Sequence, residues 1–316
     1  MIKPIGKKTN QGSISKKVLA SLKKANNQKV INFADIKEAG RHAEEMNKSV
    51  ISKKNMEKYD PLHAIYIYAQ NQMSIIVEQI SDLHELSKLA NAYEQAEDLY
   101  MPSGPPMSPL TKSYFTCWGF FDLCIGLQKE TFGTVAIDLC KFLNVDKELI
   151  QVFECMQKSR MGVYRHKGVY EKYVILEDVV TRQEITTVVP SGYLGKADQI
   201  WFARILPEPF PDLNAGYSVV FTTPYVLSEM QDGRLVNGTE EKWRLFFERT
   251  IPKTGIKDEI RAFETLMKYG RNRHYWNEFI FEGYVNHQYD MIFLAGFPDI
   301  PLSRPHSSES QKRESY

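Results

Sequence analysis

One segment near the carboxyl end carries the side-chain types of an acid–base or metal site. In residues 271–290, two histidines stand among several carboxylates. If the segment is helical, His274 and Glu278 lie one turn apart on one face, and His287 and Asp290 follow just beyond its end. Imidazole titrates near neutral pH, and a neighbouring carboxylate orients it for proton transfer or metal binding. The pattern therefore defines one alternative, a hydrolase-like or metal-dependent enzyme centred on this segment.

The sequence offers no other catalytic signature. It lacks the phosphate-cradling GxxxxGK[ST] loop, the GxGxxG fingerprint, the GxSxG nucleophile elbow and the HExxH zinc motif. Residues 271–290 also match the polar face of an ordinary solvated helix, so a structural role for them stays open at this point. We predict neither a cofactor nor a metal, and we keep enzymatic activity only as an alternative.

A second group of residues combines cations with aromatic rings. Basic side chains neutralise phosphates, and aromatic rings stack on bases, so their combination at the lip of a small barrel is typical of nucleic-acid binding. The alternative is a solvated loop leading into a strand, with tyrosines present because they favour β-structure. The group consists of Arg160, Arg165, His166 and Lys167 with Tyr164, Tyr170 and Tyr173.

The amino-terminal 30 residues form a basic arm. They contain eight lysines and no Asp or Glu, whereas the whole chain has a net charge of only +1. Such an arm attracts polyanions, although without Arg or aromatic residues it offers charge and no sequence readout. A solubilising tail is the alternative. The lysines that we predict to contact nucleic acid are Lys7, Lys8, Lys16, Lys17, Lys23 and Lys24.

Composition places the chain among ordinary globular proteins, with 43% hydrophobic and 25% charged residues. No apolar run reaches the roughly 20 residues that cross a bilayer, so we predict no membrane span. The four cysteines form no Cys-x-x-Cys pair and are interpreted as small buried hydrophobic residues. With no signal-peptide pattern at the amino terminus, the predicted location is the cytoplasm.

The first half of the chain has helical periodicity. Its clearest signal starts at Asp60-Pro61, a favourable helix start, and continues as an apolar seam to about Tyr100. One helix of that length would be roughly 60 Å long, unless it bends near Ser81. It needs a partner, which is either the chain's own helices or a second copy in a structural homodimer.

At about Met161 the period changes to that of strands. Segments rich in Val, Ile and Tyr follow at 169–180, 184–189, 200–206 and 217–227, separated by turn residues. The predicted fold class is therefore α+β, with a small antiparallel β-barrel or curled sheet in the middle. We expect a disordered basic arm at 1–12, a helical region at 13–158, the β-rich unit at 160–230, a helical carboxyl-terminal region at 239–300 and a disordered tail at 303–316.

These observations favour a non-enzymatic binding or scaffolding protein. Its expected partner is a macromolecule, engaged by the β-unit and the long helix of residues 60–100, and the lysine arm makes nucleic acid the first candidate. The two alternatives are the enzyme centred on residues 271–290 and the homodimer formed through the helix of residues 60–100.

Overall fold

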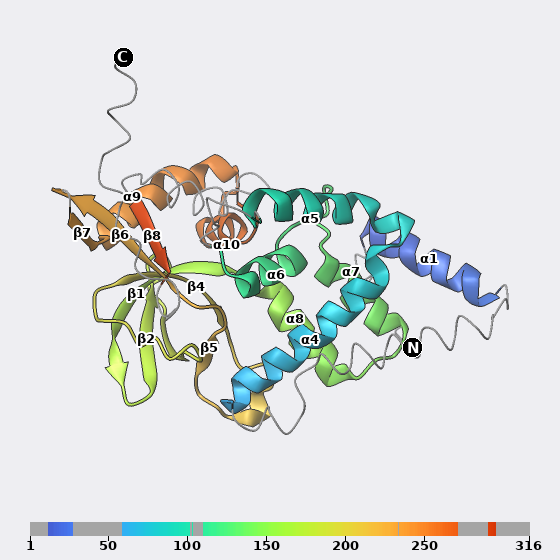
Figure 1. The fold of residues 1–316 in the computed structure, drawn as a ribbon, viewed down its shortest axis with the longest axis horizontal. Coiled ribbons are helices and arrows are strands. Elements are labelled where there is room, and N and C mark those ends of the chain that lie inside the picture. The colour runs from blue at the N-terminus through green and yellow to red at the C-terminus, as the bar shows by residue number, and fades with distance from the viewer. Residues whose placement is uncertain are drawn as a thin grey trace, which may run out of the picture. The chain divides into compact units, whose positions relative to one another are not determined.

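The computed structural model describes residues 12–27, 59–101, 103, 110–232, 234–270 and 290–294. Over these residues the chain is α+β, with helices in its first part and a small closed β-barrel after them (Figure 1). The predicted fold class is confirmed. The chain divides into two compact units. The helical unit contains the described residues up to Leu99 and those from Phe115 to Ser159. The barrel unit contains the described residues from Arg160 to Glu208 and those from Asp212 onward.

The helices of the first half begin at residues suited to helix starts. Asp60 accepts hydrogen bonds from two amides of the following turn, at 3.1 and 3.4 Å. Thr131 and Asp146 cap later helices in the same way. The helices are α1 (Ser13–Asn27), α4 (Pro61–Ser81), the 3-10 turn η1 (His84–Leu86), α5 (Ser87–Tyr100), α6 (Lys112–Phe121), α7 (Phe132–Phe142) and α8 (Lys147–Lys158).

The apolar seam of residues 60–100 forms two helices. The bend expected near Ser81 is a complete break, because α4 ends there and α5 begins only at Ser87, after η1. The seam of α4 packs within the chain, with α7 and α8 as its neighbours. The apolar seam of α4 is therefore covered by helices of the same chain, and the homodimer stays a prediction. The buried residues of α4 are Leu62, Tyr66, Ala69, Met73, Val77 and Ile80.

His63, in the first turn of α4, should make the helical unit sensitive to acid. Burial lowers its pKa from 6.5 to about 4, against the opposing effect of Asp60. The neutral ring is thus favoured in the folded state, and its contribution to stability is present above about pH 6.5 and lost as the pH falls towards 4. The shift corresponds to at most about 3 kcal/mol. Because the ring is only half-buried, we expect about 1–2 kcal/mol.

The measurement is urea unfolding at pH 7 and at pH 4.5, with His63→Gln compared with the unsubstituted chain. The variant should lose less stability between the two pH values, since glutamine does not titrate. His84→Gln is the matched control, because His84 is exposed beside the same helix. An equal pH dependence in all three proteins would contradict the prediction.

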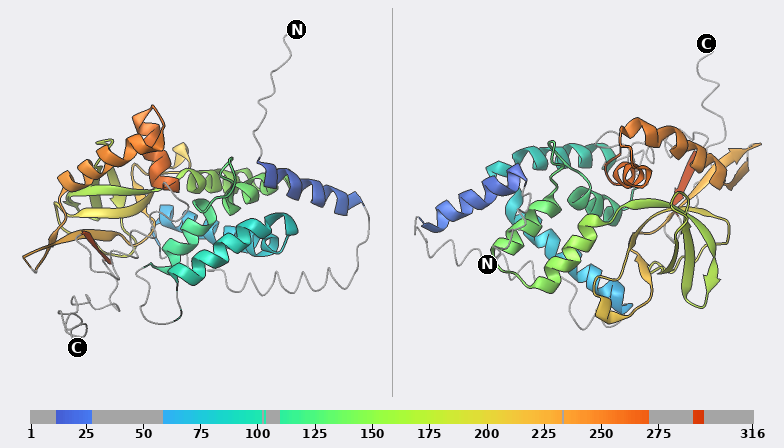
Figure 2. Two further views of the ribbon diagram at one scale, coloured as in Figure 1. Left: turned by 90° about the horizontal axis from the view of Figure 1, so that it is seen from above. Right: turned by 180° about the vertical axis from the view of Figure 1, so that it is seen from behind.

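Five strands of the second unit close into a barrel (Figures 1 and 2). The order around it is β1–β2–β3–β5–β4, and β4 pairs with β1 to close the ring; β3 and β5 run parallel, and every other pair is antiparallel. The interior is filled by apolar side chains such as Val174, Leu176 and Trp201, each fully buried. The strands are β1 (Met161–Tyr170), β2 (Tyr173–Asp178), β3 (Glu184–Val188), β4 (Ile200–Leu206) and β5 (Ser218–Val220).

Two of the predicted strand segments are each split in the structure. Residues 169–180 contain the tight turn at Glu171-Lys172 that joins β1 to β2, where Glu171 adopts a positive φ of 54°. Residues 217–227 contain the end of β5 and the start of β6. Both segments are continuous in β-favouring residues, so composition hides the turns.

The remaining elements extend the barrel unit. β6 (Tyr225–Gln231) pairs with β4, and β7 (Arg234–Asn237) and β8 (Asp290–Leu294) pair with β6. Helices α9 (Glu240–Thr250) and α10 (Glu259–Tyr269) follow β7. Across the described ranges, no helix has both the length and the apolar character to cross a membrane. The predicted disorder at 1–12 and 303–316 lies outside the described residues except for Gly12, whose carbonyl oxygen accepts a hydrogen bond from the Lys16 amide of α1.

Candidate functional site

The predicted acid–base segment falls almost entirely outside the described residues. His274, Glu278 and His287 are not among them, and Asp290 is the first residue of β8, where it pairs with Glu229 of β6. Within the part of the chain that the structure describes, no group of three or more His, Cys, Asp or Glu residues could hold a metal. The enzyme alternative stays a prediction, because three of its four residues lie outside the described part of the chain.

The described lysines of the basic arm lie on a docked helix. Lys16, Lys17, Lys23 and Lys24 are all exposed on α1, while its opposite face packs against α7 and η1 (Figure 2). Lys23 also lies over the Phe142 ring, 5.3 Å from its centroid. Lys7 and Lys8 lie outside the described residues. This part of the arm thus presents its lysines in a fixed helical arrangement.

Arg160, one of the predicted phosphate contacts, is committed to an internal cluster. Its guanidinium donates to both carboxylate oxygens of Glu264, at 2.7 and 2.8 Å, and to Asp178 at 3.2 Å. It also covers the Phe263 ring at 4.7 Å, and its side chain is only 11% exposed. The cluster ties α10 to the start of β1 and the end of β2. It leaves Arg160 little surface for a ligand.

Arg165 and Lys167 lie in a network of ion pairs on the outside of the barrel. Arg165 contacts Asp198 at 2.6 Å and Glu240 at 3.5 Å, and Lys167 contacts Glu177 at 3.0 Å. The hydrogen bond from Lys167 is the main reason that the pKa of Glu177 lies below its usual range. The neighbouring carboxylates thus neutralise the charges of Arg165 and Lys167, so this surface carries little net positive charge.

Two other members of the predicted group lie inside the barrel unit. Tyr164 belongs to the hydrophobic core, and burial raises its pKa to about 12. His166 is fully buried, with its ring 5.0 Å from that of Trp201 and its Nε2 2.8 Å from the carbonyl oxygen of Leu194. Burial lowers the pKa of His166, so its ring is neutral at pH 7. Neither residue is accessible to a macromolecule.

The other two tyrosines of the group meet a third one at the surface. Tyr170 and Tyr173 face each other across the β1–β2 turn, and Tyr170 is 69% exposed. The Tyr173 ring lies 5.4 Å from that of Tyr217, which precedes β5. Lys172 places its ammonium 5.3 Å from the centroid of Tyr173 and 5.7 Å from that of Tyr217. We call Tyr170, Lys172, Tyr173 and Tyr217 the tyrosine platform.

The platform comes from two connections of the barrel. Tyr170, Lys172 and Tyr173 belong to the β1–β2 hairpin, and Tyr217 ends the long connection from β4 to β5. Sequence reasoning missed Tyr217, which stands 44 residues after Tyr173 and follows an unremarkable loop. Of the three rings, that of Tyr170 is exposed and those of Tyr173 and Tyr217 are half-buried. Accessible aromatic rings beside an ammonium can stack on a planar ligand and attract a negative charge next to it.

The thiols of the chain show no sign of reactivity. Burial raises the pKa of both Cys140 and Cys155, which disfavours the nucleophilic thiolate. Cys117 and Cys140 are buried, as the sequence predicts for small hydrophobic residues, whereas Cys124 and Cys155 are only half-buried. The chemistry available at the platform is therefore stacking and charge attraction.

Comparisons of the chain with family models, curated proteins and solved structures gave no match. The functional proposal therefore rests on the geometry of the platform.

Proposed function

We propose that this protein is a non-enzymatic binding protein that takes single-stranded nucleic acid on the tyrosine platform. The observation that carries the proposal is the contact of Tyr173 with Tyr217, with Lys172 over both rings and the exposed Tyr170 facing Tyr173. Proteins that bind single strands combine aromatic side chains, on which successive bases stack, with cations that follow the backbone.

The position of the platform on the barrel also supports nucleic-acid binding, by analogy with other five-stranded barrels. Five-stranded barrels of the oligonucleotide- and oligosaccharide-binding class use the face of their second and third strands, with the loops joining strands one to two and four to five. The platform lies at these two connections. The outer face of β2 continues from it through Ile175, which pairs with Thr186 of β3. Fold alone does not assign function, so this analogy only adds to the side-chain geometry.

The phosphate contact at the platform itself would come from Lys172, which is exposed there. Lys16, Lys17, Lys23 and Lys24, exposed on α1 of the helical unit, would be a separate set of phosphate contacts. The acids that surround Arg165 and Lys167 compete with phosphate for these two side chains. We therefore assign them no part in binding.

The test is fluorescence anisotropy with a labelled single-stranded oligonucleotide of mixed sequence, about 12 nucleotides long. Tyr217→Ala should weaken binding roughly 5- to 150-fold, because each base stacked on an aromatic ring contributes about 1–3 kcal/mol. Tyr68→Ala is the matched control, since Tyr68 is a 44% exposed tyrosine on α4. It should bind like the unsubstituted chain.

A salt series from about 50 to 200 mM tests the lysines separately. Each phosphate neutralised on a single strand adds about 0.7 to the slope of log affinity against log salt concentration. Replacing the four exposed α1 lysines by Gln should therefore flatten the slope by up to about 3. Absence of binding at the lowest salt would overturn the proposal. Tyrosine-dependent binding of an uncharged oligosaccharide in place of the oligonucleotide would make the platform a carbohydrate site.

A further inference from the structure

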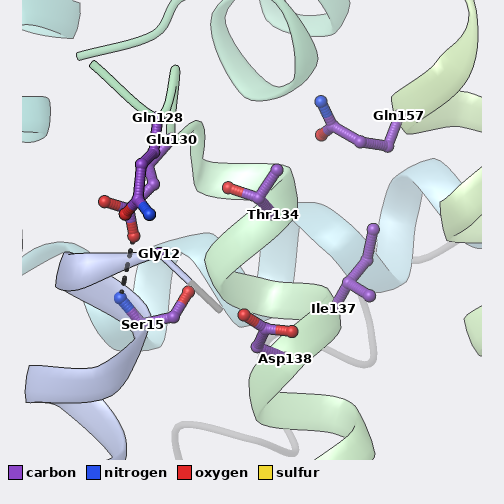
Figure 3. A pocket seen from close by; sticks show the side chains of 8 residues that line it. All are labelled: Gly12, Ser15, Gln128, Glu130, Thr134, Ile137, Asp138 and Gln157. Carbon is purple, nitrogen blue, oxygen red and sulfur yellow. Dashed lines mark hydrogen bonds between the residues drawn. The ribbon is translucent and has the colours of Figure 1, made fainter. Parts of the chain in front are cut away.

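A cavity in the helical unit is lined by residues that do not include any member of the tyrosine platform. It has a volume of about 250 Å³ and lies between the start of α1 and one face of α7 (Figure 3). At ~30 Å³ for each water molecule in the liquid, it has room for about eight of them. It is therefore large enough for a small organic molecule. Its lining residues are Gly12, Ser15, Gln128, Glu130, Thr134, Ile137, Asp138 and Gln157.

Most polar groups of the lining already have partners. The Glu130 carboxylate accepts from the amides of Ile14 and Ser15, at 2.9 and 3.1 Å. Thr134 Oγ1 donates to the Thr131 carbonyl at 2.9 Å. Gln157 accepts from the Thr131 hydroxyl and donates to the Phe121 carbonyl. These groups give the cavity a fixed shape and leave little hydrogen-bonding capacity for a ligand.

Ser15 and Asp138 are different. The Ser15 side chain is buried, with 1% of the residue exposed, and its Oγ makes no well-directed hydrogen bond. Its hydroxyl lies near the Asp138 carboxylate and helps to lower the pKa of that group. Figure 3 shows both groups directed at the space between α1 and α7. A hydroxyl oxygen and a carboxylate that approach one another still have further lone pairs, so this pair marks the part of the lining that can accept hydrogen bonds from a ligand.

The electrostatics of the cavity favour a cation. Asp138 is half-buried, and burial raises its pKa; the nearby Ser15 hydroxyl opposes this shift, and the charge of Glu130 adds to it slightly. Lys141 lies near enough to oppose this shift, but its ammonium is paired with Glu154 at 2.6 Å. Two carboxylates therefore share one partly enclosed space, and a positive charge beside Asp138 would relieve their repulsion.

A metal ion fits this lining less well than an organic cation. The oxygens of Glu130 are occupied by N–H donors at the start of α1, which would repel a metal. Metal ions also need several free oxygen ligands at short distance, whereas an ammonium needs acceptors for three N–H bonds. Asp138 and Ser15 provide such acceptors side by side.

We propose that this cavity binds the ammonium group of a small organic amine, with Asp138 as the charged acceptor and Ser15 Oγ as a second acceptor. The aliphatic part of the ligand would lie along Ile137. Nucleic acid takes no part in this binding, so the proposal can be tested independently of the tyrosine platform.

The experiment is an NMR titration of the full chain with 1,4-diaminobutane at pH 7, with 1,4-butanediol as the uncharged probe of matched length. We expect saturable shifts of the Ser15 and Asp138 amides with the diamine and none with the diol. Asp138→Asn, which keeps the shape of the side chain, should weaken binding of the diamine about tenfold or more, because a charge-assisted hydrogen bond is lost. Glu94→Gln, at an exposed acid of α5, is the control and should bind normally.

Three results would overturn the proposal. They are unsaturated shifts throughout the titration, equal binding of the diol, and equal weakening by Asp138→Asn and Glu94→Gln. Glu130 is not substituted in this experiment, because its carboxylate also holds the start of α1. Circular dichroism of Asp138→Asn should match the unsubstituted chain, which separates loss of binding from loss of fold.

Discussion

Arg160→Ala should destabilise the barrel unit by about 3–5 kcal/mol. Asp178 has only 3% of its side chain exposed, and Arg160 forms an ion pair with it at 3.2 Å. Removing the guanidinium leaves this carboxylate buried without its cation, and it also removes the bidentate bond to Glu264 and the contact with the Phe263 ring. The free energy of unfolding is measured by urea denaturation, followed by tryptophan fluorescence.

Arg165→Ala is the matched control for this substitution. Arg165 also forms ion pairs with acids of the barrel unit, but its side chain is 38% exposed and that of Asp198 is 72% exposed. Exposed pairs contribute about 0–1 kcal/mol, so this variant should unfold almost like the unsubstituted chain. If Arg160→Ala instead left stability unchanged and weakened oligonucleotide binding, Arg160 would be the phosphate contact that the sequence predicts.

Much of the fold follows from local sequence signals. Asp60-Pro61 and Asp146 predict the starts of α4 and α8, because capping involves only residues within one turn. The change of period at Met161 marks the beginning of β1. The closure of the barrel could not be predicted in this way. It depends on pairing of β1 with β4 and on the parallel pair β3–β5, and neither contact leaves a local pattern in the sequence.

The candidate site was predictable only in part. Tyr170 and Tyr173 stand close to a run of cations in the sequence, so the pattern of cations and rings includes them, but it leaves out Lys172, which lies between them. The same pattern includes Arg160, because sequence spacing does not reveal the carboxylate of Glu264 that binds it 104 residues later. Tyr217 was missed for the corresponding reason. Residue type and spacing identify which side chains can bind, and the tertiary contacts decide which of them remain accessible.

Glu130 shows how such a distant contact can position a whole element. A turn closed by the paired backbone bonds of Ile125 and Glu130 holds this residue, which is 4% exposed, beneath the start of α1. Its carboxylate accepts from the amides of Ile14 and Ser15 and from the Ser13 hydroxyl. It thereby satisfies amides that have no partner within the helix, and its charge complements the helix dipole.

Glu130→Ala should therefore release the start of α1 while the rest of the helical unit stays folded. Hydrogen bonds to charged groups contribute about 1.5–3 kcal/mol each, so we expect hydrogen exchange of the Ile14 and Ser15 amides to accelerate about 100-fold. Gln128→Ala removes one exposed bond, to the Ser13 amide at 2.9 Å, and should accelerate exchange only a few-fold. Glu130→Gln keeps an acceptor and loses the charge, so its effect should fall between the two.

The pattern of exchange decides what the contact does. If only α1 amides accelerate, Glu130 holds the lysine-bearing helix in place, and the same variant should alter the salt dependence of oligonucleotide binding without affecting the tyrosine platform. Equal acceleration in α4 and α8 would mean that Glu130 stabilises the whole unit and that α1 cannot detach alone. Unchanged exchange would show that water replaces the carboxylate at little cost. In that case the docking of α1 rests on Val18 and Leu19, its buried apolar residues.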